Sequence, residues 1–144
     1  MADYSILTEL LNLSNVKVVH YQLVGPNRIN LFVESTLPTA LCPNCQRPSS
    51  NAHDLGDPQM LRDLPIWERR CWLRLMPRRF KCDYCHNTFV ERLAWREPER
   101  DYSLRYEQHI YERARKEPLT QVAKDEGLSE EAVQGIFERW AKKR

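Results

Sequence analysis

Two Cys-x-x-Cys pairs separated by thirty-six residues constrain the fold of this chain more than any other feature. The pairs are Cys42 with Cys45 and Cys82 with Cys85. Two residues between cysteines let both thiolates of a pair reach a single tetrahedral zinc ion. Cysteine pairs in a chain without a recognisable secretion signal favour metal ligation over disulfide bonds. The spacing therefore predicts one structural zinc ion whose four thiolate ligands leave no coordination position for water.

Alternatives remain open for the cysteines and for their neighbours. A single Cys-x-x-Cys pair is also the motif of thiol oxidoreductases. His53 or His86 could replace one thiolate as a ligand, although four well-spaced cysteines make this unnecessary. Cys71 lies in a strand-like run, and we expect it to be a small apolar core residue and not a ligand.

The size and composition of the chain favour a metal-stabilised protein. Its 144 residues are 42% hydrophobic and include nine prolines, so the core is expected to be small. No run approaches the roughly 18 apolar residues of a membrane helix. Asp3 and Glu9 stand where a signal peptide would carry basic residues, so we expect a cytoplasmic protein.

The first 35 residues predict a helix and a β-hairpin. Residues 4–13 carry leucines and an isoleucine at helical spacing. Two β-branched runs, 16–24 and 28–35, follow and are joined by Gly25-Pro26-Asn27, a hairpin signal. We expect residues 1–35 to pack on the segment that follows.

Residues 36–97 are predicted to form a zinc ribbon. Three prolines around the first cysteine pair indicate a loop or knuckle in residues 36–50. Strand-like runs then lead to the second pair and beyond it, at residues 59–67, 70–76, 78–81 and 88–92.

Residues 98–144 are predicted to be helical. A helix over 103–116 precedes a second helix with Pro118 in its first turn and Gly127 at its end, and Ser129 would cap a third. The short turn before the third helix is typical of the helix-turn-helix, whose last helix lies in the major groove. A bundle used for packing or dimerisation is the alternative, favoured by Glu130 and Glu131, which would repel phosphates.

The predicted fold class is therefore α+β: a small zinc ribbon with an N-terminal helix and β-hairpin, followed by a three-helix helix-turn-helix domain. Residues 62–81 carry a net charge of +5, which suggests an anionic partner. Aromatic residues alternate with these cations and suit phosphate contact by guanidinium groups. The candidate phosphate ligands in this stretch are Arg62, Arg69, Arg70, Arg74, Arg78, Arg79 and Lys81.

The third helix supplies a second set of candidate DNA contacts. Gln134 and Arg139 are the expected base or backbone contacts of a recognition helix at this position. Lys142, Lys143 and Arg144 would hold phosphates at its far end.

Several motifs together resemble the N-terminal zinc-binding region of insertion-sequence transposases of the L-three family. They are Cys42-Pro-Asn-Cys45, Arg62-Asp-Leu-Pro65, Arg78-Arg-Phe-Lys-Cys82-Asp-Tyr-Cys85 and Thr88-Phe89, with the helix-turn-helix after them. The resemblance covers about residues 36–144 and departs from the family pattern at His86, where such knuckles often carry glycine.

The resemblance implies recognition of terminal inverted repeats, followed in the family by a ribonuclease-H-like catalytic domain with three metal-binding carboxylates. This chain has seven scattered aspartates and no further strand-and-helix array after the helix-turn-helix, so we do not expect it to be an enzyme. The leading hypothesis is a DNA-binding module of transposase origin, truncated or stand-alone, in the prokaryotic cytoplasm and nucleoid-associated when bound.

Rival hypotheses come from two other classes. The first is a zinc-ribbon adaptor that binds a transposase or another protein of a nucleoprotein assembly, for which exposed tryptophans would argue. The second is an enzyme, either a thiol redox protein or a transposase acting in trans. The sequence leaves a homodimer open as the oligomeric state.

Overall fold

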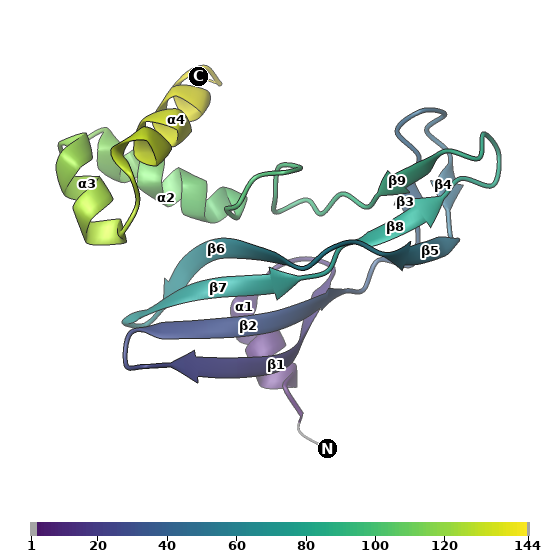
Figure 1. The fold of residues 1–144 in the computed structure, drawn as a ribbon, viewed down its shortest axis with the longest axis horizontal. Coiled ribbons are helices and arrows are strands. Elements are labelled where there is room, and N and C mark those ends of the chain that lie inside the picture. Colours follow the sequence, from purple (N-terminus) through teal and green to yellow (C-terminus); the bar gives the residue numbers. More distant parts are fainter. Residues whose placement is uncertain (1–2, 144) are drawn as a thin grey trace.

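A computed structural model describes residues 3–143 and has the α+β fold that the sequence predicts (Figure 1). None of the helices in this part of the chain is long and apolar enough to cross a bilayer. The elements are α1 (Ser5–Leu11), β1 (Val16–Val24), β2 (Arg28–Ser35), β3 (Ala40–Leu41), β4 (Pro48–Ser49), β5 (Ala52–Leu55), β6 (Gln59–Ile66), β7 (Arg69–Leu75), β8 (Arg78–Lys81), β9 (Thr88–Val90), α2 (Leu104–Ala114), α3 (Leu119–Glu126) and α4 (Glu130–Ala141).

The largest unit is a four-stranded sheet in the order β1-β2-β7-β6. It consists of two antiparallel hairpins, β1-β2 and β6-β7, whose central strands β2 and β7 pair in parallel. The β1-β2 hairpin has the predicted bounds. The structure thus joins strands from residues 1–35 and from residues 36–97 in one sheet.

One face of this sheet forms the main core. Alternate residues of the central strands point inward, and Leu31, Leu61 and Leu73 are fully buried there. Helix α1 covers this face with Leu7 and Leu11, which are one helical turn apart. On the opposite face of the sheet, Arg62 and Arg70 contact the end of α3.

The zinc ribbon lies at one end of the sheet and has a small core of its own. It contains β3-β4 and the three-stranded sheet β5-β8-β9, and β7 leads into β8 through two residues. Ala40, Phe80 and Phe89 pack against Cys42 and Cys82. A cluster of this size cannot stabilise two loops without help from a metal ion.

The C-terminal segment forms the three predicted helices: α2 comes first, and α3 and α4 form the helix-turn-helix. Ser103 and Ser129 cap α2 and α4 through their hydroxyl groups, and Gly127 ends α3 with a left-handed φ of 69°. Pro118 is the residue before α3, one position earlier than the predicted first turn. The three helices enclose their own core of Tyr106, Ile110, Val122, Ala123, Val133 and Ile136.

Two consecutive residues of β6 attach this helical domain to the sheet. The buried Asp63 carboxylate accepts hydrogen bonds from the Ser103 hydroxyl at 2.6 Å and from the Arg105 guanidinium at 2.8 and 2.6 Å. Arg62, 5% exposed, donates to the Glu126 carbonyl at 2.8 Å and lies 3.6 Å from its carboxylate. These contacts hold the start of α2 and the end of α3 against the sheet.

Arg70 of β7 adds a second contact to the same helix end. Its Nη2 donates to the Asp125 carbonyl at 2.8 Å, so Arg62 and Arg70 together bind carbonyls at the C-terminal end of α3. Cations are stabilising at this end of a helix because the unpaired carbonyls carry partial negative charge. Burial alone would raise the pKa of Glu126, but hydrogen bonds from Tyr106, His109 and Arg113 lower it and keep the carboxylate ionised.

Gly127→Ala is expected to lower the free energy of unfolding more than Gly25→Ala does. Both glycines have left-handed φ angles, which cost alanine about 1–2 kcal/mol. A Cβ at Gly127 would also lie 2.6 Å from Arg70 Nη1 and displace it from α3, at a further cost of about 1 kcal/mol, whereas no atom lies within 4 Å at Gly25. Urea unfolding measures the difference, and equal losses would contradict this role of Arg70.

Candidate metal centre and DNA interface

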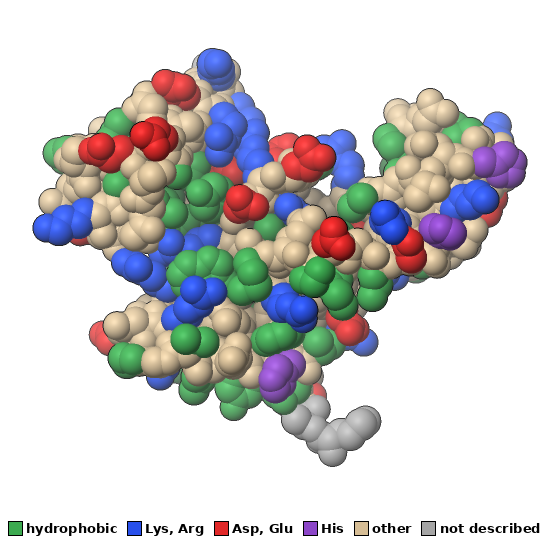
Figure 2. Space-filling view, viewed as in Figure 1, with side chains coloured by type: hydrophobic (Ala, Val, Ile, Leu, Met, Phe, Trp, Pro, Cys, Tyr) green, Lys and Arg blue, Asp and Glu red, His purple; other side chains and the backbone are tan. Residues whose placement is uncertain are grey.

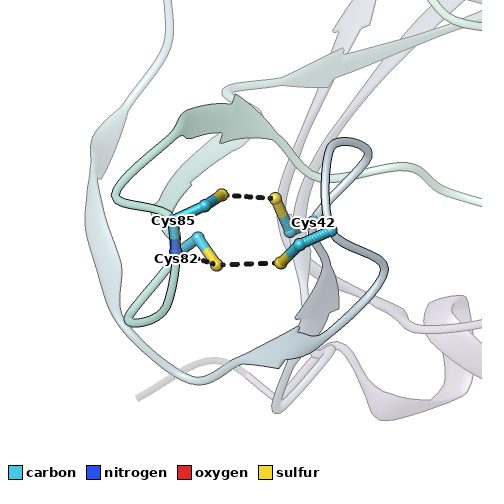
Figure 3. A group of neighbouring side chains, drawn as sticks. Cys42, Cys82 and Cys85 are labelled. Carbon is cyan, nitrogen blue, oxygen red and sulfur yellow. Dashed lines mark hydrogen bonds between the residues drawn. The ribbon is translucent and has the colours of Figure 1, made fainter.

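The four predicted cysteines come together at the ribbon (Figure 3). Their Sγ atoms all lie within 4.8 Å of one another, with Cys42 and Cys85 at 3.6 Å and Cys45 and Cys82 at 3.4 Å. A tetrahedral ion with Zn–S bonds of about 2.3 Å separates its sulfur atoms by roughly 3.8 Å. The donor set and its spacing therefore fit one structural zinc ion.

The two knuckles have the same backbone geometry. Cys42 O accepts from Gln46 N at 2.8 Å, and Cys82 O accepts from His86 N at 3.0 Å. Gln46 and His86 have left-handed φ angles of 66° and 63°. His86 is thus a residue with a side chain at a position that glycine occupies more easily, which accounts for glycine in similar knuckles.

The surroundings of the cysteines favour thiolates at the second knuckle. Hydrogen bonds from the Asn44 side chain and the Asn87 backbone lower the pKa of Cys85 to about 6. The backbone N–H groups of Cys85 and Tyr84 lower the pKa of Cys82. At Cys45, the Arg47 backbone favours the thiolate, but burial and the other cysteines raise the pKa to about 11 when no ion is bound. Four thiolates at this spacing repel one another, and the positive charge of a zinc ion would offset their repulsion.

Among residues 3–143, the residues grouped at a possible metal site are the four cysteines alone. His53 and His86 are exposed and outside that group. Cys71 is fully buried in the sheet core, where burial raises the pKa of its thiol to about 12. It is an inert core residue, as the sequence predicts.

The exposed face of α4 carries more acid than base. Val133 and Ile136 are buried against α2 and α3. The residues on the opposite side of the helix are Glu130, Glu131, Gln134 and Glu138, which border a shallow hollow beside the start of α3. Gln134 is half-buried and donates to the Glu138 carboxylate at 2.7 Å.

Three of the predicted cationic contacts are engaged inside the protein. Arg62 is buried against the helical domain. The Arg78 guanidinium donates to Ser35, to the Leu37 carbonyl and to the Glu91 carboxylate, whose side chain is fully buried. Arg139 of α4 faces Glu107 of α2, whose side chain is also fully buried, with 3.6 Å between Nη2 and Oε2.

The remaining predicted cations lie at or near the surface. Arg79 forms a bidentate pair with Asp54. Arg69 donates to the Gly25 carbonyl at 2.8 Å, and Lys143 lies 3.9 Å from Glu97. Lys81 and Lys142 are exposed, and Arg74 is half-buried on the sheet. Arg144 lies outside the described residues.

Sequence reasoning missed the acids that occupy these arginines. Glu126, Glu91 and Glu107 pair with Arg62, Arg78 and Arg139 respectively. Asp63 follows Arg62 directly in sequence, but the two side chains leave opposite faces of the strand and Asp63 binds Arg105 instead. The acids that pair with these arginines are distant from them in sequence and gave no local signal.

A four-thiolate ribbon attached to a helix-turn-helix defines a metal-stabilised DNA-binding protein. Residues 38–85 match the family described as the zinc-finger of transposase IS204/IS1001/IS1096/IS1165, and residues 91–141 match the helix-turn-helix domain of transposase family ISL3. The chain therefore carries the zinc ribbon and helix-turn-helix domains of ISL3-family transposases. No catalytic domain is evident among the residues that the structure describes.

A bacterial relative supports the same assignment. The transposase for insertion sequence element IS1001 from Bordetella parapertussis is 33% identical over 67 residues. That match covers 46% of this chain and 16% of the relative, so the chain corresponds to a small part of that protein. No solved structure matches the chain significantly.

Cys82→Ser is expected to abolish stoichiometric zinc binding and to unfold the ribbon, because three thiolates leave the ion open to water. The zinc content of the purified protein measures the first effect, and its near-ultraviolet circular dichroism measures the second. Cys71→Ala is the matched control and should retain about one zinc ion per chain. A zinc-loaded Cys82→Ser protein would rule out the four-thiolate site.

His86→Gly is expected to raise the unfolding midpoint of the zinc-loaded protein, because glycine relieves a left-handed conformation that costs about 1 kcal/mol. His86→Ala removes the same imidazole and keeps the strain, so it should not stabilise. Thermal melting at fixed zinc concentration compares the two. If alanine stabilises as much as glycine, the backbone explanation fails.

Proposed function

We propose that this chain binds specific duplex DNA, such as the terminal inverted repeats of an insertion sequence, and acts by recognition without catalysing a step itself. The observation that carries the proposal is the arrangement of α3, the Gly127 turn and α4, whose outer side is open to solvent. In a helix-turn-helix this side of the last helix enters the major groove. The function implies a cytoplasmic protein, held on the nucleoid when bound.

The chemistry of α4 is suited to base readout more than to phosphate binding. Gln134 can form a bidentate pair with adenine, and a glutamate can accept from the cytosine amino group. The carboxylates of Glu130, Glu131 and Glu138 repel phosphates, so other residues must supply affinity for the backbone. Lys142 and Lys143, which are exposed at the C-terminal end of α4, would supply part of this affinity.

The phosphate contacts proposed for the rest of the chain are Arg69, Arg74 and Lys81. Five predicted cations are left out of this proposal because their guanidinium groups serve the fold: Arg62, Arg70, Arg78, Arg79 and Arg139. Replacing Arg78, for example, would leave Glu91 as an unpaired buried carboxylate, which typically costs about 3–5 kcal/mol.

Gln134→Ala is expected to change which sequences are enriched when the zinc-loaded protein selects from random duplex DNA. The reason is that the amide would no longer favour one base over the others, a loss of about 1–3 kcal/mol in discrimination. Sequencing of the bound fraction measures the change. Gln108→Ala on the exposed side of α2 is the control and should select the wild-type motif. An identical motif from both variants would exclude Gln134 from readout.

A zinc-ribbon adaptor is the second candidate function, and Trp67 is the observation that favours it. Its side chain is 93% exposed at the tip of the β6-β7 hairpin, on a residue with a left-handed φ of 53°. Trp95 is buried, and Trp72 and Trp140 are half-buried. An exposed tryptophan is typical of a protein contact. Co-elution with the element's transposase in nuclease-treated extract, lost in Trp67→Ser, would favour this function over DNA binding alone.

A further inference from the structure

The face of the four-stranded sheet opposite α1 carries a regular set of basic and aromatic side chains. We call it the outer sheet face, defined by His20, Arg28, Phe32, Arg70, Trp72 and Arg74. Arg28 pairs with Arg70 and Phe32 with Arg74 across the parallel strands, which places these side chains on one surface. Figure 2 shows basic side chains set among hydrophobic ones over this sheet.

Aromatic rings hold the arginines of this face in place. The Arg28 guanidinium lies over the Trp72 ring at 3.8 Å, and Arg62 lies over the same ring at 4.7 Å. Arg74 lies 5.2 Å from the Phe32 ring centre. Stacking uses the flat side of a guanidinium and leaves the N–H groups at its edge for a phosphate.

Those N–H groups are largely free within the described part of the chain. Arg28 donates one bond, from Nε to the Asn30 side chain, and Arg74 has no hydrogen bond or ion pair to a described residue. This differs from Arg78 and Arg79, which carboxylates occupy. Glu34 is the one acidic residue among the outward strand positions, and it lies 4.0 Å from Lys17.

The outer sheet face is also joined rigidly to the helix-turn-helix. Arg62 and Arg70 bind carbonyls at the end of α3, so the sheet and α4 are held in one orientation. Two binding surfaces on one rigid body act together without the entropy cost of ordering a linker. Since α4 itself presents mainly carboxylates, a cationic surface held in a fixed orientation to it supplies what the helix lacks.

We propose that the outer sheet face, through Arg28 and Arg74, binds the phosphate backbone of the duplex DNA that the helix-turn-helix recognises. The assignment rests on the proposed function in that the partner is DNA, and it deepens that function by adding Arg28 and by making the aromatic-stacked arginines of one sheet face the backbone contact. Backbone contacts give affinity that depends on salt and not on sequence.

The test is the binding of the full zinc-loaded chain to a random-sequence duplex and to its selected site, followed by fluorescence anisotropy. Arg28→Gln with Arg74→Gln should weaken binding to both duplexes by the same factor. Loss of two phosphate contacts lowers the salt slope by about 1.8, so the fall in affinity between roughly 50 and 200 mM salt becomes about tenfold smaller. The selected motif stays unchanged, which separates this result from failure of readout by α4.

Two matched variants keep the proposal falsifiable. Arg47→Gln removes an exposed arginine that likewise stacks on an aromatic ring, that of Tyr84 at 4.3 Å in the ribbon, and it should leave the affinity and slope near wild type. Glu34→Gln removes the acid of the face and should tighten binding to every duplex. Unchanged affinity and slope in the folded double variant would overturn the assignment, as would an equal loss in Arg47→Gln or no tightening in Glu34→Gln.

Discussion

The buried pair of Arg62 and Asp63 determines how the two halves of this protein are arranged. Both side chains extend from β6. Asp63 holds the start of α2, and Arg62 holds the end of α3. Removing one member of such a buried network typically costs about 3–5 kcal/mol, because its partners stay buried and charged. Without this attachment the sheet and the helix-turn-helix would be two small domains on a tether. The Arg-Asp-Leu-Pro motif is thus a docking element, and its Leu64 packs against the helical core.

The zinc ribbon depends on a comparable arrangement at the other end of the sheet. Phe80, Phe89 and Ala40 bury too little surface to order the knuckles, so the metal ion must provide the remaining stability. Arg78 and Glu91 join the ribbon to the end of β2 through Ser35. Motif residues that resemble the transposase family, such as Arg62, Asp63 and Arg78, therefore maintain the architecture, while outward residues of the sheet and of α4 are free to contact a ligand.

Local rules predicted much of this structure from sequence. The β1-β2 hairpin, the four cysteines, the left-handed end of α3 at Gly127 and the cap at Ser129 depend on residues close together in the chain. The parallel pairing of β2 with β7 depends on strands forty residues apart, and no local pattern encodes it. The charge of residues 62–81 suggested a binding surface, but charge alone cannot show whether a carboxylate from another element already pairs with an arginine.

The parallel pairing of β2 and β7 also bears on how the metal site assembles. Thirty-six residues separate the two cysteine pairs, and bringing the ends of so long a flexible segment together carries a substantial loop-closure entropy. Pairing of β2 with β7 brings Val33 beside Leu75, which lie shortly before the first and second pairs respectively. The sheet thereby meets most of that entropic cost without the ion, so zinc affinity is in part a property of strands that never touch the metal.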